Sequence, residues 1–302
     1  MIRTRVLVPL CALALIPGAA VGGLAVGSNA APAPEAPRTT QPVLDGIRAR
    51  HVGAEDRIVF RFRGGLPPHR HAAYVDRLVA DGSGNAIPVA GRAILQVTFG
   101  TAVAHNAGGP TAPLRTAYAL PNAVMSVQSG DFEGFVSYGI GLARRTPFHV
   151  TTLHNPARVV VHVGAGFPTV LRKVWYFNRA NFVANTPPFF VARPRPVIAA
   201  TPATGLLDRL FAGVTPTEFG NGLRALRSGA TGFAIRSITD GIARVRLTGG
   251  CASGGSTVTV AGEIMPTLRQ LGNVDWVKIS DPAGHTEHPF GHQDSIPACL
   301  EP

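Results

Sequence analysis

Apolar and polar residues alternate with a period of two through much of residues 54–165. Ile58, Phe60 and Phe62 are each followed by Val or Arg, which is typical of a strand with one buried face. The same pattern predicts further strands at 74–79, 94–99, 123–128, 134–140, 148–153 and 158–163. Turn-forming segments such as 81–85 separate them. Seven short strands without a convincing helix predict an all-β, sandwich-like domain over residues 54–165.

The pattern changes after a break in composition at residues 166–172, around Gly166 and Pro168. A helix is predicted from Thr201-Pro202 to Gly213. A second helix, capped by Ser256 or Thr257, is predicted to run through Val260, Ile264, Leu268 and Leu271, with a kink at Pro266. Asp240-Gly241 is a strong hairpin signal. Strands are predicted at 174–177, 189–191, 233–238, 242–247 and 274–279. The order β-β-α-β-β-α-β predicts an α+β domain over residues 173–302, with a mixed sheet and two helices.

The amino terminus has the pattern of a cleavable secretory signal peptide over residues 1–30. Arg3 and Arg5 precede an apolar stretch at 6–16, and Ser28-Asn29-Ala30 offers small side chains for cleavage before Ala31. Residues 31–53 are rich in Pro and Ala and are expected to be a flexible linker. The sequence therefore predicts a secreted, extracytoplasmic protein. Membrane attachment is expected only if the apolar segment is retained as an anchor.

Cysteine usage agrees with an oxidising compartment. The chain has 3 cysteines, and cleavage of the signal peptide would remove Cys11. Cys251 and Cys299 would remain as a pair, which predicts a disulfide between them. A reactive or metal-binding Cys251 is the alternative.

The formal net charge is +11, and arginine supplies nearly all of it, because Lys173 and Lys278 are the only lysines. No basic helix or aromatic-basic module of the nucleic-acid-binding kind is present. Outside the cytoplasm the anionic partners are wall polymers and lipid head groups. A planar guanidinium suits their carboxylates and phosphates. The candidate ligand-binding residues are Arg61, Arg63, Arg144 and Arg145, and an ordinary solvated face is the alternative.

Three C-terminal histidines are the candidate metal ligands: His285, His288 and His292. Their spacings would place them on one face of a helix, but nearby Pro and Gly residues argue against a helix there. A loop site stays open. No nucleophile elbow or phosphate-binding loop is found, and no cofactor is expected. The sequence therefore favours a protein that is not an enzyme, with a metal-dependent wall hydrolase using these histidines as the alternative.

Six pieces of the first half occur in a characteristic order over about 110 residues: 56–62, 64–67, 74–76, 81–84, 130–134 and 156–161. No single piece is specific, but in this order they resemble the AMIN-like domain of actinobacterial envelope proteins. The resemblance implies localisation to the periplasm or wall, often through peptidoglycan.

Four pieces of the second half, at 174–177, 206–215, 240–245 and 265–271, carry a second resemblance. Together they resemble a GerMN domain, the module named from spore germination and sporulation proteins. One departure is Arg246, which stands where the family's hairpin strand usually carries an acid. The resemblance implies a non-enzymatic role in envelope or sporulation assemblies.

Together these features predict a non-catalytic, secreted cell-envelope protein. The β domain would bind peptidoglycan or another anionic wall component, and the GerMN-like domain would bind a protein partner. A regulatory or assembly factor without wall affinity is a further alternative.

Overall fold

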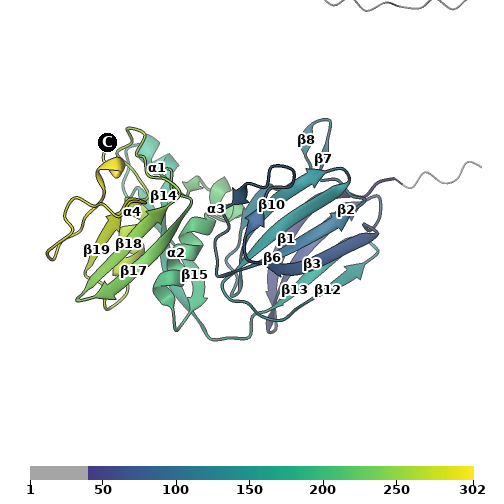
Figure 1. Cartoon of the computed structure of the whole chain (residues 1–302), viewed down its shortest axis with the longest axis horizontal. Coiled ribbons are helices and arrows are strands. Elements are labelled where there is room, and N and C mark those ends of the chain that lie inside the picture. Colours follow the sequence, from purple (N-terminus) through teal and green to yellow (C-terminus); the bar gives the residue numbers. More distant parts are fainter. Residues whose placement is uncertain (1–39) are drawn as a thin grey trace, which may run out of the picture. The chain divides into compact units, whose positions relative to one another are not determined.

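The computed structural model describes residues 40–302, which lie within one compact unit (Figure 1). The predicted signal peptide at 1–30 and the start of the predicted linker lie outside the described residues. None of the helices in residues 40–302 is long and apolar enough to cross a membrane.

The first part of this unit is a sandwich of two antiparallel sheets (Figure 1). The four-stranded sheet has the order β1-β2-β13-β12. The five-stranded sheet has the order β3-β6-β11-β10-β9. Their strands are β1 (Val43–Val52), β2 (Glu55–Arg63), β3 (His69–Val75), β6 (Ala93–Gly100), β9 (Arg115–Ala117), β10 (Ala123–Phe132), β11 (Phe135–Leu142), β12 (Phe148–Leu153) and β13 (Arg158–Gly164). Two short ribbons complete the domain: β4 (Leu78–Val79) with β5 (Ala86–Ile87), and β7 (His105–Asn106) with β8 (Gly109–Pro110).

The alternation of β2 explains how the two sheets pack. Phe60 and Phe62 are buried, and both contact Phe99 of the opposite sheet, with ring centroids 5.0 and 5.1 Å apart. Phe60 also meets Tyr138 edge-on at 5.7 Å. These contacts join the inner faces into one core, so the predicted sandwich is confirmed.

One boundary of the prediction is wrong, because residues 43–52 form strand β1 and are not linker. Leu44 and Ile47 of this strand are buried in the sandwich core. The pairing of β1 with β2 shifts register between Leu44 and Gly46. The two buried residues Leu44 and Ile47 are therefore three positions apart and not two. The bulge interrupts the period of two, which is why the alternation did not reveal this strand.

The second part is an α+β region, as predicted, but its strands form two small sheets and not a single one. The antiparallel sheet β15-β14-β16 combines β14 (Thr169–Asn178), β15 (Phe190–Ile198) and β16 (Leu223–Arg224). The second sheet, β17-β18-β19, is mixed, because β18 pairs antiparallel with β17 and parallel with β19. Its strands are β17 (Gly232–Thr239), β18 (Ile242–Thr248) and β19 (Trp276–Ser280).

Two amphipathic helices supply most of the helical contribution to the core of this region (Figure 1). They are α2 (Pro202–Ala212), close to its predicted bounds, and α4 (Ala261–Arg269). Helix α4 starts after Val260, so the predicted cap at Ser256 or Thr257 is wrong. Helix α2 starts with Pro at its first position and ends at Gly213, whose φ of 104° suits glycine. The remaining helical segments are short: α1 (Arg179–Val183), α3 (Pro216–Gly220) and the 3₁₀ turn η1 (Ala298–Leu300).

The predicted disulfide is present and ties the C-terminal segment to the loop that follows β18. Cys251 and Cys299 are bonded, with Cα atoms 5.7 Å apart and 48 residues of separation. Ser253 N–H also donates to Cys299 O at 2.7 Å, and Leu300 beside it is buried.

Replacing both cysteines by serine should lower the free energy of unfolding by up to about 4 kcal/mol, because the unfolded chain gains the entropy of an open loop. Urea denaturation measures this loss, and the reduced native protein should reproduce it. An unchanged transition midpoint would show that the bridge contributes nothing.

Glu263 is a carboxyl group buried in the core of the α+β region. Its oxygens accept Phe177 N–H at 2.9 Å and Leu226 N–H at 3.0 Å, so it joins α4 to β14 and to the segment after β16. Burial raises the pKa of Glu263 to about 8.

This pKa predicts a stability that falls as pH rises from about 4.5 to 8, because the folded state holds a proton that the unfolded state releases. Glu263→Gln should lose this dependence, which is at most about 1.4 kcal/mol per pH unit. The variant's stability relative to the native protein should therefore rise across this window in urea titrations. A constant difference across the window would contradict the assignment.

Candidate functional site

The outer face of the four-stranded sheet collects six arginines, which we call the arginine face. Alternation along β2 turns Asp56, Ile58 and Phe60 inward and the odd-numbered residues outward. Strand register extends the outward set to β1 and β13, because directly paired residues share a face. The members are Arg48, Arg50, Arg57, Arg61, Arg63 and Arg158.

Few carboxylates balance this charge. Asp45, at the bulge of β1, contacts Arg61 at 2.7 Å and Arg63 at 3.2 Å. Both guanidinium groups are at least half exposed, so these contacts are weak and leave the arginines accessible. The second outward carboxylate is Glu55 at the start of β2. The face therefore has an excess of positive charge that suits an anionic polymer.

Glu55 lies beside two histidines from neighbouring strands. His162 of β13 is paired directly with His149 of β12, and their rings stack at 4.2 Å. His162 Nδ1 lies 3.0 Å from one Glu55 oxygen, and His149 Nδ1 lies 3.8 Å from the other. The hydrogen bond with His162 lowers the pKa of Glu55. Arg57 Nε also approaches Glu55, at 3.4 Å.

The structure separates the four arginines expected to bind ligand into two settings. Arg61 and Arg63 belong to the arginine face. Arg144 and Arg145 lie in the connection from β11 to β12, where Arg144 is over the Phe167 ring and Arg145 is over the Tyr74 ring at 4.5 Å. The stacked Arg145 holds its position by cation–π attraction, beside an open hollow formed with Thr146 and Phe148.

The C-terminal histidines do not come together in the described part of the chain. His285, His288 and His292 lie in turns and bends without a helix, and His285 is instead 3.3 Å from Asp281. Within residues 40–302, the group whose ligand atoms lie within 4.8 Å of one another is Glu55, His149 and His162. Sequence reasoning missed this group because its three members come from three strands.

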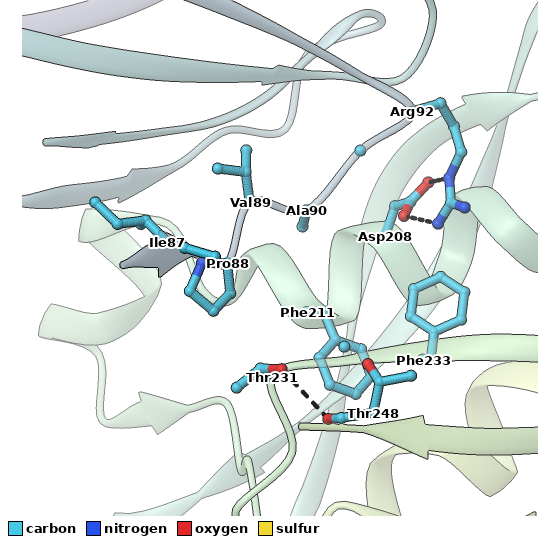
Figure 2. A pocket seen from close by; sticks show the side chains of 13 residues that line it. Ile87, Pro88, Val89, Ala90, Arg92, Asp208, Phe211, Thr231, Phe233 and Thr248 are labelled. Carbon is cyan, nitrogen blue, oxygen red and sulfur yellow. Dashed lines mark hydrogen bonds and ion pairs between the residues drawn. The ribbon is translucent and has the colours of Figure 1, made fainter. Parts of the chain in front are cut away.

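A crevice of about 450 Å³ lies where the β domain meets the α+β region (Figure 2). Residues 86–92 form one wall, while Phe211 and Phe233 contribute to the other. Arg92 of the β domain reaches across to Asp208 of α2, and its guanidinium lies 5.2 Å from the centre of the Phe233 ring. The lining is mainly apolar, and its one acid is paired with its one base. Within this lining, the carboxylate of Asp208 is thus already engaged by the guanidinium of Arg92.

The bond between Arg92 and Asp208 is a two-point ion pair. Arg92 Nε donates to Asp208 Oδ2 at 2.8 Å, and a terminal nitrogen donates to the other oxygen. Burial raises the pKa of Asp208, whereas the hydrogen bond to Asp208 raises that of Arg92. The pair therefore offsets only part of the free energy needed to bury the carboxylate.

Arg209 is the neighbouring residue on α2 and is 1 % exposed. Burial lowers its pKa to about 10, so the side chain is still charged at neutral pH. Its guanidinium enters the β domain and donates to four backbone carbonyls of one loop. The acceptors are Tyr118 at 3.0 Å, Ala123 at 2.9 Å, Pro121 at 3.1 Å, and Leu120.

The same loop is held from the opposite side by Asp56 of β2, which is fully buried. Its carboxylate accepts the N–H groups of Asn122 at 2.6 Å and Ala123 at 2.7 Å. The sequence carried a signal for this junction, because Asp208-Arg209 interrupts an apolar run on the face of α2 expected to be buried. A charged pair at such a position indicates a buried polar partner.

These features define a class of protein: an antiparallel β-sandwich with a basic sheet face, joined firmly to an α+β region. A family model described as the AMIN-like domain matches residues 42–165, which are the β domain. AMIN-like domains are generally linked to peptidoglycan and cell-wall binding, and they occur in extracytoplasmic proteins. No curated protein and no solved structure matches the chain. The GerMN resemblance of residues 173–302 stays a prediction.

Replacing Arg209 by Met should lower the free energy of unfolding by about 3–5 kcal/mol, since it leaves several buried carbonyls without a donor. Arg209→Lys keeps the charge but loses the planar fork, and should recover only part of this loss. Urea denaturation measures both. Arg172→Met, at an exposed position on β14, is the control and should stay within about 0.5 kcal/mol. An equal loss of unfolding free energy in Arg172→Met and Arg209→Met would show that the bonds of Arg209 to the loop do not stabilise the fold.

Proposed function

We propose that this protein is a non-catalytic, secreted cell-envelope protein that binds peptidoglycan or another anionic wall component through the arginine face. The observation that carries the proposal is the six-arginine sheet face with only two outward carboxylates. Guanidinium groups can bond carboxylates of peptides or phosphates of polymers through two parallel hydrogen bonds.

The family match supports the same assignment from an independent direction. It covers the domain that carries the arginine face, and AMIN-like domains are generally of the wall-binding, non-catalytic type. An extended sheet face suits a long polymer better than a small metabolite, because successive arginines along β1 and β2 can contact successive anionic groups.

The α+β region is proposed to bind a protein partner. It carries several large apolar side chains in water, including Leu171 at 70 % exposure, Val183 at 75 % and Phe290 at 85 %. Because Arg209 fixes α2 to the β domain, a partner bound to this region would be held in a constant orientation to the wall.

The proposal predicts that purified protein sediments with insoluble wall material at low salt and is released as salt rises, because ions screen exposed charges. Arg48→Gln/Arg50→Gln/Arg61→Gln should remove most of the bound fraction. The control is Arg172→Gln/Arg179→Gln/Arg236→Gln, which removes the same charge from exposed positions in the α+β region.

The comparison of the two triple variants distinguishes binding at the arginine face from attraction by the net positive charge of the whole protein. Loss of sedimentation in the β-sheet variant alone supports the arginine face. Equal loss in both would indicate attraction through net charge only. Failure of the native protein to sediment at low salt would refute wall binding.

A further inference from the structure

Glu55, His149 and His162 form a compact group of metal-ligating side chains that wall binding does not use. They come from β2, β12 and β13, three adjacent strands of one hydrogen-bonded sheet. Their backbone positions are therefore set by strand register and not by a flexible loop. This is the kind of rigid support that a metal site requires.

The spacing of the ligand atoms fits one small divalent ion. Zinc is held at about 2.0–2.2 Å by imidazole and carboxylate ligands, so tetrahedral geometry places neighbouring ligand atoms about 3.3 Å apart. His162 Nδ1 lies 3.0 Å from one Glu55 oxygen and His149 Nδ1 lies 3.8 Å from the other, so both nitrogens are near that spacing from the carboxylate. All three ligand atoms lie within 4.8 Å of one another.

The imidazole rings can turn to meet an ion between them. They now stack with an interplanar angle of 13°, so both Nδ1 atoms cannot aim at one point without a rotation. His149 is 56 % exposed, and the final side-chain torsion of histidine is soft, so its ring is free to rotate. The less exposed His162 is the fixed ligand.

Thr151 supports His162 as a ligand from the far side of the ring. Its hydroxyl lies 2.9 Å from His162 Nε2. In the metal-free protein Nδ1 donates to Glu55. When a metal takes the place of that proton, the hydroxyl can accept from Nε2–H and hold the ring in position. Such a partner on the second ring nitrogen is common among metal-binding histidines.

We propose that Glu55, His149 and His162 bind one zinc ion on the outer face of the four-stranded sheet. Two imidazoles and one carboxylate favour zinc over magnesium or calcium, which prefer oxygen ligands. Three protein ligands leave one coordination position open. The site lies on the arginine face beside Arg57. An anionic oxygen of a bound polymer can therefore occupy the open coordination position.

Arg57 provides an internal test, because its positive charge lies 3.4 Å from Glu55. It disfavours a cation at this site, whereas it favours an anionic polymer on the same face. Arg57→Gln should therefore tighten zinc binding severalfold and weaken sedimentation with wall material. Zinc affinity and wall sedimentation should therefore change in opposite directions, which distinguishes the metal site from the arginine face.

The experiment is a calorimetric titration of zinc chloride into purified protein without a polyhistidine tag. One equivalent should bind, and cobalt in its place should give the visible absorption of a four-coordinate site. His149→Ala and Glu55→Gln should each weaken binding by more than about tenfold. His149 is exposed, so its variant should fold normally, which a melting curve verifies.

The matched control removes the three C-terminal histidines together, as His285→Ala/His288→Ala/His292→Ala, and should leave zinc affinity unchanged. Absence of stoichiometric zinc binding overturns the proposal. Loss of zinc binding in the variant without the C-terminal histidines also overturns it. Wall sedimentation measured in a chelator is independent of this outcome, so the metal site and the proposed function can fail separately.

Discussion

The structure depends on one buried charge that crosses between its two parts. Arg209 leaves helix α2 of the α+β region and donates to the carbonyls of a loop in the β domain, while Asp56 accepts N–H groups of the same loop. A guanidinium taken out of water needs nearly all of its donors satisfied, and the carbonyls of this loop provide four acceptors. Separating α2 from the loop would therefore leave a buried charge without partners, which is costly.

The arginine face shows how an ordinary strand pattern can produce a binding surface. Burial of Ile58, Phe60 and Phe62 forces the intervening residues of β2 outward, and strand pairing adds the outward residues of β1 and β13. The core and the surface are thus two consequences of the same alternation. A change of one residue in register would exchange them, so the hydrophobic core also protects the position of the charges.

Most elements could be predicted from the sequence because their patterns are local. Six of the seven expected strands of the β domain, helix α2 and the hairpin of β17 with β18 follow from periodicity and turn residues. The strand expected at 74–79 is wrong, because residues 74–75 end β3 and residues 78–79 form the separate strand β4. Strand β1 was missed because a bulge spoils its alternation. Of the candidate site residues, Arg61 and Arg63 could be placed on one face, since they are two apart on one strand. Arg144 and Arg145 are instead held by the rings of Phe167 and Tyr74, which no local pattern encodes.

The sequence by itself determined most of the strands, the sandwich class and the pairing of Cys251 with Cys299, since each depends on residue types and their spacing. Only the tertiary structure decided which side chains meet. Glu55, His149 and His162 are separated by up to 107 positions, yet strand register brings their ligand atoms together. Arg209 likewise finds its partners about 90 residues away. Such contacts depend on the order of strands in a sheet, and pairing between distant strands leaves no periodic signal in the chain.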